Sequence, residues 1–333
     1  MKKTIRQLEC IIFLCLIFLL GSCQGVHIGP IGNAGSLPEK EIVFQRVHDI
    51  NIFSSPGERR LGFVDAEGNA AYSNLNQIPM VPPVYPMYTS DNTLLVFNAP
   101  RGRGFMSTID SQGNLVEYNL IGVHKRVTPI NNTHEAVIVT MDKGGSPEEI
   151  PYSLRRLDLV SGELLQTYLT TQPDGRTITL LDIGTHVLHD QELVFLRSFG
   201  IPRRYEIVLL DVVSQQETAL IESTTRLSGP AFSPDGQWIA YGNVDGLYIL
   251  NRMTGGSVPS KIVDAVSSER APLLPSWSSD GEWLVYHDCL QDCYEKLSLD
   301  HDIEDFAIFK VNVATGEKTL LVEGGVNPFW RNE

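Results

Sequence analysis

The chain has 333 residues, with 26 lysines and arginines against 40 aspartates and glutamates, and a formal net charge of −14 at pH 7. This balance argues against nucleic acid or an anionic membrane surface as the binding partner, because both carry negative charge. A well-hydrated surface, divalent cations or a basic partner remain compatible with it.

The first segment has the pattern of a bacterial lipoprotein signal peptide. A basic start at Met1–Arg6 precedes an apolar run at Ile11–Leu20, which is too short to cross a hydrocarbon core of ~30 Å. The sequence LGSC ending at Cys23 resembles a lipobox, which implies lipidation of Cys23 by acyl chains such as palmitate; an ordinary secretory signal is the alternative. The lipid would anchor the exported protein to the cell envelope. Gln24 favours the outer membrane if the host has two membranes.

Cleavage after residue 22 leaves 23 basic and 39 acidic residues, a formal charge of −16. Residues 24–40 are rich in glycine and proline and lack periodicity, which predicts a flexible tether. The predicted organisation is a signal peptide at 1–22, a lipidated cysteine and tether at 23–40, and one folded domain at 41–333.

Short β-rich runs separated by turn signals fill the chain from about residue 41. The stretch Pro230–Tyr241 (PAFSPDGQWIAY) has a near twin 45 residues later at Pro275–Tyr286 (PSWSSDGEWLVY), and Pro86–Phe97 is a weaker copy. In each, Asp-Gly or Asp-Asn supplies a tight turn between strands rich in aromatic and β-branched residues. Each stretch therefore predicts a β-hairpin.

Six further strands, each followed by a small or acidic turn, close the repeats. They lie at 61–68, 107–113, 154–163, 207–215, 247–255 and 309–317. Asp65, Asp110, Asp158 and Asp211 recur at equivalent positions, which favours a structural turn role over a shared active site. Repetition at this period is typical of a β-propeller, whose blades are four-stranded sheets around a channel. About 290 residues in six repeats predict an all-β, six-bladed β-propeller, with five or seven blades as alternatives.

The repeat phrase at Pro230–Tyr241, followed by the strand Leu247–Leu250 and by Thr254-Gly255, resembles the WD-like repeat of TolB-type propellers. The resemblance is strong over 226–333 and faint over 40–225. It implies the propeller alone, because the chain leaves no room for the separate N-terminal α/β domain of the Tol protein itself. It also implies recognition of a protein or peptide partner.

The C-terminal segment Gly325–Trp330 matches the opening of a repeat, Gly229–Phe232, but no hairpin follows it. The first repeat shows later strands and no such opening. We therefore expect the C-terminal segment to supply the inner strand of the first blade, which closes the ring without a free sheet edge. A frayed tail is the alternative.

Beyond the signal peptide and Cys23, two cysteines remain, Cys289 and Cys293, an even pair in an exported protein. A disulfide bond between them is predicted; free thiols and metal ligation are the alternatives. The same insertion is the most acidic part of the chain and is the predicted binding surface, with a solvated loop as the alternative. Its candidate residues are Asp288, Asp292, Asp300, Asp302 and Asp305. No cofactor or metal is expected, with a calcium ion at this loop as the alternative.

Common catalytic motifs, including GxSxG, HExxH and GxxxxGK[ST], do not occur in the sequence. We therefore expect a monomeric, membrane-anchored scaffold that binds a protein or peptide and no nucleic acid, and not an enzyme. An envelope glycan-active hydrolase is the alternative. It would need two carboxylates at the channel mouth, roughly 5–9.5 Å apart.

Overall fold

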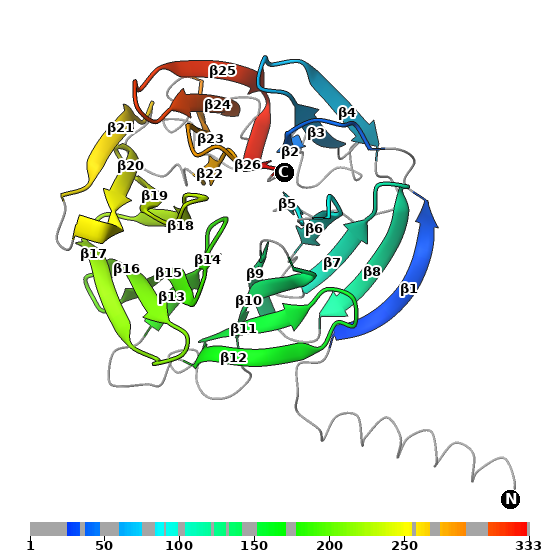
Figure 1. Cartoon of the computed structure of the whole chain (residues 1–333), viewed down its shortest axis with the longest axis horizontal. Helices are drawn as coiled ribbons and strands as arrows, with labels where there is room; N and C mark the ends of the chain where they lie inside the picture. The colour runs from blue at the N-terminus through cyan, green and yellow to red at the C-terminus, as the bar shows by residue number, and fades with distance from the viewer. Residues whose placement is uncertain are drawn as a thin grey trace, which may run out of the picture.

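The computed structural model describes residues 25–33, 37–46, 60–74, 84–89, 91–98, 104–120, 123–130, 133–141, 152–170, 178–254, 258–266, 274–290 and 306–331. These residues form a six-bladed β-propeller, with six antiparallel sheets around a common axis (Figure 1). The predicted all-β class and blade number are confirmed. The one helix in these ranges is the 3₁₀ turn η2 (Arg252–Thr254), and none of the described helices is long and apolar enough to cross a membrane.

The blades are numbered in chain order, and the strands of each are named from the inner to the outer edge of the sheet. Blade 1 consists of β26 (Gly325–Trp330), β2 (Ile42–Arg46), β3 (Arg60–Val64) and β4 (Ala70–Asn74). Blade 2 consists of β5 (Val84–Tyr88), β6 (Leu94–Asn98), β7 (Gly104–Ile109), β8 (Asn114–Leu120) and β1 (Gly25–Asn33). Blade 3 consists of β9 (Val123–Pro129), β10 (Glu135–Met141), β11 (Tyr152–Asp158) and β12 (Leu164–Thr170).

The remaining three blades complete the ring. Blade 4 consists of β13 (Ile178–Asp182), β15 (Glu192–Phe199), β16 (Arg204–Asp211) and β17 (Glu217–Ser223), with β14 (Leu188–His189) paired to β15. Blade 5 consists of β18 (Leu227–Phe232), β19 (Trp238–Asn243), β20 (Gly246–Asn251) and β21 (Ser260–Asp264). Blade 6 consists of β22 (Ser276–Trp277), β23 (Trp283–Cys289), β24 (Phe306–Asn312) and β25 (Lys318–Glu323).

The repeated Ser-x-Asp-Gly phrase forms the turn between the first two strands of blade 5. The Ser233 hydroxyl donates to Asp235 Oδ1 at 2.6 Å and accepts the backbone N–H of Trp238 at 2.9 Å. Gly236 has a φ of +68°, a left-handed conformation that glycine adopts without strain. Ser278 and Asp280 make the same bond in blade 6, at 2.5 Å. The serine and the aspartate of the phrase recur because their side chains form the hydrogen bonds that hold this turn.

The aspartates that close the repeats have the structural role that the sequence predicts. Asp158 Oδ1 accepts the backbone N–H groups of Val160 and Ser161 at 2.8 and 2.7 Å. These bonds, first of all the one from Ser161, lower the pKa of Asp158 because they stabilise its charged form. Asn312 occupies the equivalent place in blade 6 and accepts two backbone N–H groups through its side-chain oxygen.

The ring is closed by the C-terminal strand, as predicted. β26 is the inner strand of blade 1 and pairs antiparallel with β2, with Trp330 opposite Ile42 and Phe329 opposite Val43. Figure 1 shows β26 on the inner side of the ring, beside β2. This pairing gives β2 a partner on its inner side, so β2 has no free edge.

The structure differs from the predicted tether within residues 24–40. β1 is a fifth strand on the outer edge of blade 2, where it pairs antiparallel with β8 through two register shifts. An outer strand leaves backbone N–H and C=O groups unpaired, and such an edge accepts any extended segment with free backbone groups. Glycine and proline predict flexibility from local preference alone, so the composition does not reveal this pairing.

Candidate functional site

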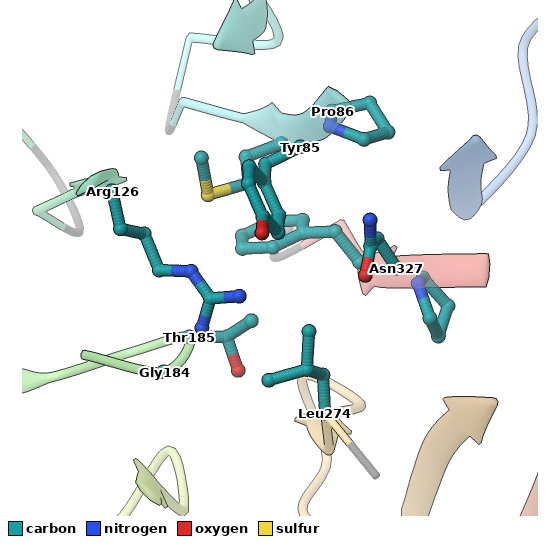
Figure 2. Close-up of a pocket in the computed structure, with 10 residues that line it drawn as sticks. Tyr85, Pro86, Arg126, Gly184, Thr185, Leu274 and Asn327 are labelled. Carbon is teal, nitrogen blue, oxygen red and sulfur yellow. The ribbon is translucent and has the colours of Figure 1, made fainter. Parts of the chain in front are cut away.

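A pocket lies at the centre of the ring, where residues from five of the six blades meet (Figure 2). Its walls come from β5, β9 and β26, from the segment after β13 and from the segment before β22. The volume open to the centre of a water molecule is about 20 Å³, enough for roughly one water-sized group. None of the described residues that line it is an aspartate or glutamate.

Among the described residues of the pocket wall, Arg126 is the charged one, and it is only 7% exposed. Its Nη1 donates to the carbonyl oxygen of Ile183 at 2.5 Å and lies 3.6 Å from Asp182 Oδ1. Its guanidinium carbon lies 4.5 Å from the ring centre of Tyr85. Burial opposes the charge of Arg126, but Asp182 and Tyr85 outweigh this effect, and its pKa is raised. The pocket therefore contains a permanent, rigidly held cation.

Polar side chains and one close backbone contact fix the segments around Arg126. Thr128 Oγ1 donates to the carbonyl oxygen of Gly184, and Thr185 Oγ1 to that of Pro275, both at 2.7 Å. A Cβ atom on Gly184 would lie 2.2 Å from the carbonyl oxygen of Pro230. The backbones of blades 4 and 5 thus approach closely at this point, and glycine is the residue that permits it.

Two buried histidines lie near the pocket. His287 accepts the backbone N–H of Asn327 through Nδ1 at 3.3 Å, and His186 Nε2 lies 3.4 Å from the hydroxyl of Ser276. Burial lowers the pKa of His186 to about 4. Burial and the nearby charge of Arg126 lower the pKa of His287 to about 3. Both imidazoles are therefore neutral at physiological pH, and Arg126 keeps the centre of the ring cationic.

The prediction that Asp288 belongs to an exposed acidic binding surface is wrong. Its side chain is fully buried, where Oδ2 accepts the N–H of Val266 at 3.1 Å and Oδ1 accepts the N–H of Cys289 at 2.8 Å. Lys318 Nζ lies 3.7 Å from Oδ2, and burial raises the pKa of Asp288. Asp288 therefore holds blades 5 and 6 together and does not face solvent.

Several predicted site residues lie outside the described residues. They are Cys23, Cys293, Asp292, Asp300, Asp302 and Asp305. Cys289 is disulfide-bonded, and its pairing with Cys293 stays a prediction. Within the described ranges, no group of three or more His, Cys, Asp or Glu side chains is placed to hold a metal ion.

The pocket residues were not identified by the sequence patterns. Tyr85, Leu274 and Asn327 each precede the proline of a repeat phrase, at Pro86, Pro275 and Pro328, but these phrases were interpreted as hairpins and as a closing strand and not as pocket walls. No local signal marks Arg126, because the residues before it in β9, His124 and Lys125, are also polar. Its burial, and with it the need for polar partners, follows only from the packing of the ring.

A second hollow, open to solvent, lies at the end of the hairpin between β15 and β16. Its volume open to the centre of a water molecule is about 440 Å³, and its walls include Ile201, Arg204, Glu206 and Glu222. Glu206 is ion-paired with Arg197 at 2.8 Å. The wall of this hollow therefore combines the apolar side chain of Ile201 with charged side chains of both signs.

The fold places the chain in the class of six-bladed β-propellers. No protein-family model matches it, and no curated protein matches it. Among solved structures, a candidate TolB from Agrobacterium tumefaciens has a TM-score of 0.57 at 15% identity, with 92% of each chain covered. TolB from Acinetobacter baumannii has a TM-score of 0.58 at 14% identity, with 88% of this chain and 67% of that chain covered. The TM-scores show a shared propeller fold, and at identities this low the similarity to TolB extends to the fold alone.

Proposed function

We propose that the protein is a lipid-anchored component of the bacterial cell envelope whose propeller binds a protein or peptide partner at the centre of the ring. The observation that carries this proposal is the central pocket, in which one buried cation lies among apolar and neutral polar side chains. Concave sites with a few fixed polar groups in an apolar wall are typical of ligand recognition.

The character of the pocket favours a small acceptor group from the partner. Arg126 supplies a cation, Thr185 and Asn327 supply neutral polar groups, and Leu274 and Phe329 supply apolar wall. A carbonyl or carboxylate at the tip of a peptide loop satisfies this arrangement. The repeat phrase at Pro230–Tyr241 resembles that of TolB-type propellers, and this resemblance also favours recognition of a protein or peptide.

The glycan hydrolase alternative has no residues to support it in this pocket. Hydrolysis of a glycosidic bond uses two carboxylates roughly 5–9.5 Å apart, and the described part of the lining contains neither aspartate nor glutamate. Asp182 lies behind Arg126 and is engaged with it. We therefore propose a binding role and no hydrolytic one.

A crosslinking pull-down from native membranes tests this function. The wild-type lipoprotein is compared with Leu274→Trp, which fills the pocket, and with Val258→Trp, a control at an 87% exposed position on blade 5. We expect one dominant partner with wild type and control, and its loss with Leu274→Trp. Equal capture by all three proteins would contradict binding at this pocket. Absence of any partner, together with hydrolysis of envelope glycans, would favour the enzyme instead.

A further inference from the structure

The inner edge of blade 4 is interrupted by a bulge toward the centre of the ring. β13 ends at Asp182, opposite Leu196. β14 begins at Leu188, opposite Leu193. Five residues, Ile183–Val187, therefore stand opposite two residues of β15, and the excess leaves the sheet. We call this segment the plug. Figure 1 shows β14, which follows it, on the inner side of blade 4.

The plug is fixed by contacts with four other blades. Thr128 Oγ1 in blade 3 donates to the carbonyl oxygen of Gly184 at 2.7 Å. The backbone N–H of Phe232 in blade 5 donates to the carbonyl oxygen of His186 at 3.0 Å. Two further contacts join the plug to blades 6 and 1: Thr185 with Pro275, and His186 with Phe329. Motion of the plug would break contacts with all four blades, so it is a fixed part of the ring.

The plug lies on one side of the central pocket. In each blade the inner strand runs from the crossing between blades to the first turn, so the inner strands begin on one side of the ring and end on the other. Gly184 and Thr185 line the pocket, whereas His186 contacts Phe232, the last residue of β18. His186 therefore lies between the pocket and the side of the ring that carries the first turns. The side chains of the plug are at most 8% exposed, so they are packed within the ring.

The plug also positions the cation of the pocket. Arg126 Nη1 donates to the carbonyl oxygen of Ile183, the first residue of the plug. Thr128 follows Arg126 by two residues on β9, and alternate residues of a strand face the same side. The two side chains therefore bind successive carbonyl groups of the plug. Thr128 is not among the described residues that line the pocket, so it acts on the pocket through the plug.

We propose that the plug is the floor of the binding site and that Thr128 is a positioning residue that fixes this floor. The inference rests on the proposed function and makes its partner more specific. The partner presents one acceptor group to Arg126, at a chain end or at the tip of a loop, and no chain passes through the ring. The open volume of about 20 Å³ is suited to such a tip.

Random heptapeptides displayed on phage serve as the probe, in a linear format with a free end and in a disulfide-closed loop. They are selected on the full lipoprotein in detergent and then counter-selected on Leu274→Trp, which fills the pocket. Enrichment of the linear format indicates a chain end, and enrichment of the closed format indicates a loop tip. If neither format yields a peptide that distinguishes the two proteins, the proposed function is wrong and the inference fails with it.

Variants of Thr128 test the positioning role with a selected peptide. Thr128→Val removes the hydroxyl at nearly constant volume and should lower the affinity severalfold, whereas Thr128→Ser keeps the hydroxyl and should restore it. Thr140→Val is the matched control. Thr140 is a fully buried threonine of the same blade, and its hydroxyl has no hydrogen-bond partner in the described part of the chain. An affinity of Thr128→Val equal to that of the control would overturn the positioning role.

Photo-crosslinking tests the floor without any change to the plug. The photoreactive residue p-benzoylphenylalanine replaces either Tyr85, in the pocket wall, or Asp190, an exposed residue in the turn beyond the plug. The selected peptide should crosslink at position 85 and not at position 190. Crosslinks at both positions would show that the peptide passes the plug, and this result would overturn the proposal even if binding at the pocket is confirmed.

Discussion

The imidazole of His186 packs against the ring of Phe329, with ring centres 5.0 Å apart. Phe329 belongs to the C-terminal strand that closes blade 1, and His186 belongs to blade 4. The hydroxyl of Ser276 connects the two, because it lies 3.4 Å from His186 Nε2 and accepts the backbone N–H of Trp330 at 2.9 Å. Ring closure and a buried titratable group are thus part of one packed unit.

Removal of the closing strand should abolish cooperative unfolding. Deletion of residues 326–333 exposes the inner edge of β2 and removes the ring of Phe329, which is 2% exposed. The milder change Phe329→Ala should cost about 3–5 kcal/mol, the usual range for a buried phenylalanine. Thermal and urea unfolding of both proteins measure this. Val213→Ala, at an exposed position, is the control, and a deletion mutant that melts like wild type would refute closure by β26.

Acid should destabilise the fold through the two buried histidines. The unfolded state takes up protons near pH 6.5, whereas the folded state resists them until about pH 4 at His186 and about pH 3 at His287. The contribution of the two neutral histidines to the free energy of unfolding is complete above pH 6.5. It declines as the pH falls, by at most ~1.4 kcal/mol per pH unit for each histidine. Asp288 has a raised pKa, so its protonation makes the folded state more stable relative to the unfolded state as the pH falls.

Single variants isolate this effect from that of Asp288. His186→Asn removes the titrating ring and suits the left-handed backbone at this position, where φ is 47°. Urea unfolding between pH 7 and pH 5 should show a smaller loss of stability in the variant than in the wild type. Identical slopes would mean that His186 does not titrate differently in the folded state.

The turn aspartates should act mainly through their side-chain oxygen, with a smaller contribution from their charge. Asp158→Ala removes two accepted backbone bonds and should cost about 1 kcal/mol, since the turn remains open to water. Asp158→Asn should cost less, because Asn312 makes the equivalent bonds in blade 6 and only the added strength of a charged acceptor is lost. Chemical unfolding compares the two variants. A loss as large for asparagine as for alanine would show that the negative charge itself is required.

The features that the sequence by itself determined are those held by short-range bonds. Ser233, Asp235 and Trp238 form a turn within six residues. Each copy of the phrase therefore predicts a hairpin by itself, and the number of repeats predicts the number of blades. The six blades, the structural role of the turn aspartates and the closing strand followed from such patterns. Closure could be predicted because the C-terminal phrase begins a repeat that it does not complete.

Only the tertiary structure decided which distant residues meet. Tyr85, Arg126, Thr185, Leu274 and Asn327 reach one pocket because the ring brings five blades to its centre, and no local pattern records that approach. Asp288 looked like part of an exposed acidic loop, but the register of β23 places it inside the sheet. The composition of β1 predicts a flexible tether, but the segment forms a strand because it pairs with the edge strand β8. In each case long-range packing, and not local preference, determines the environment of the side chain or strand.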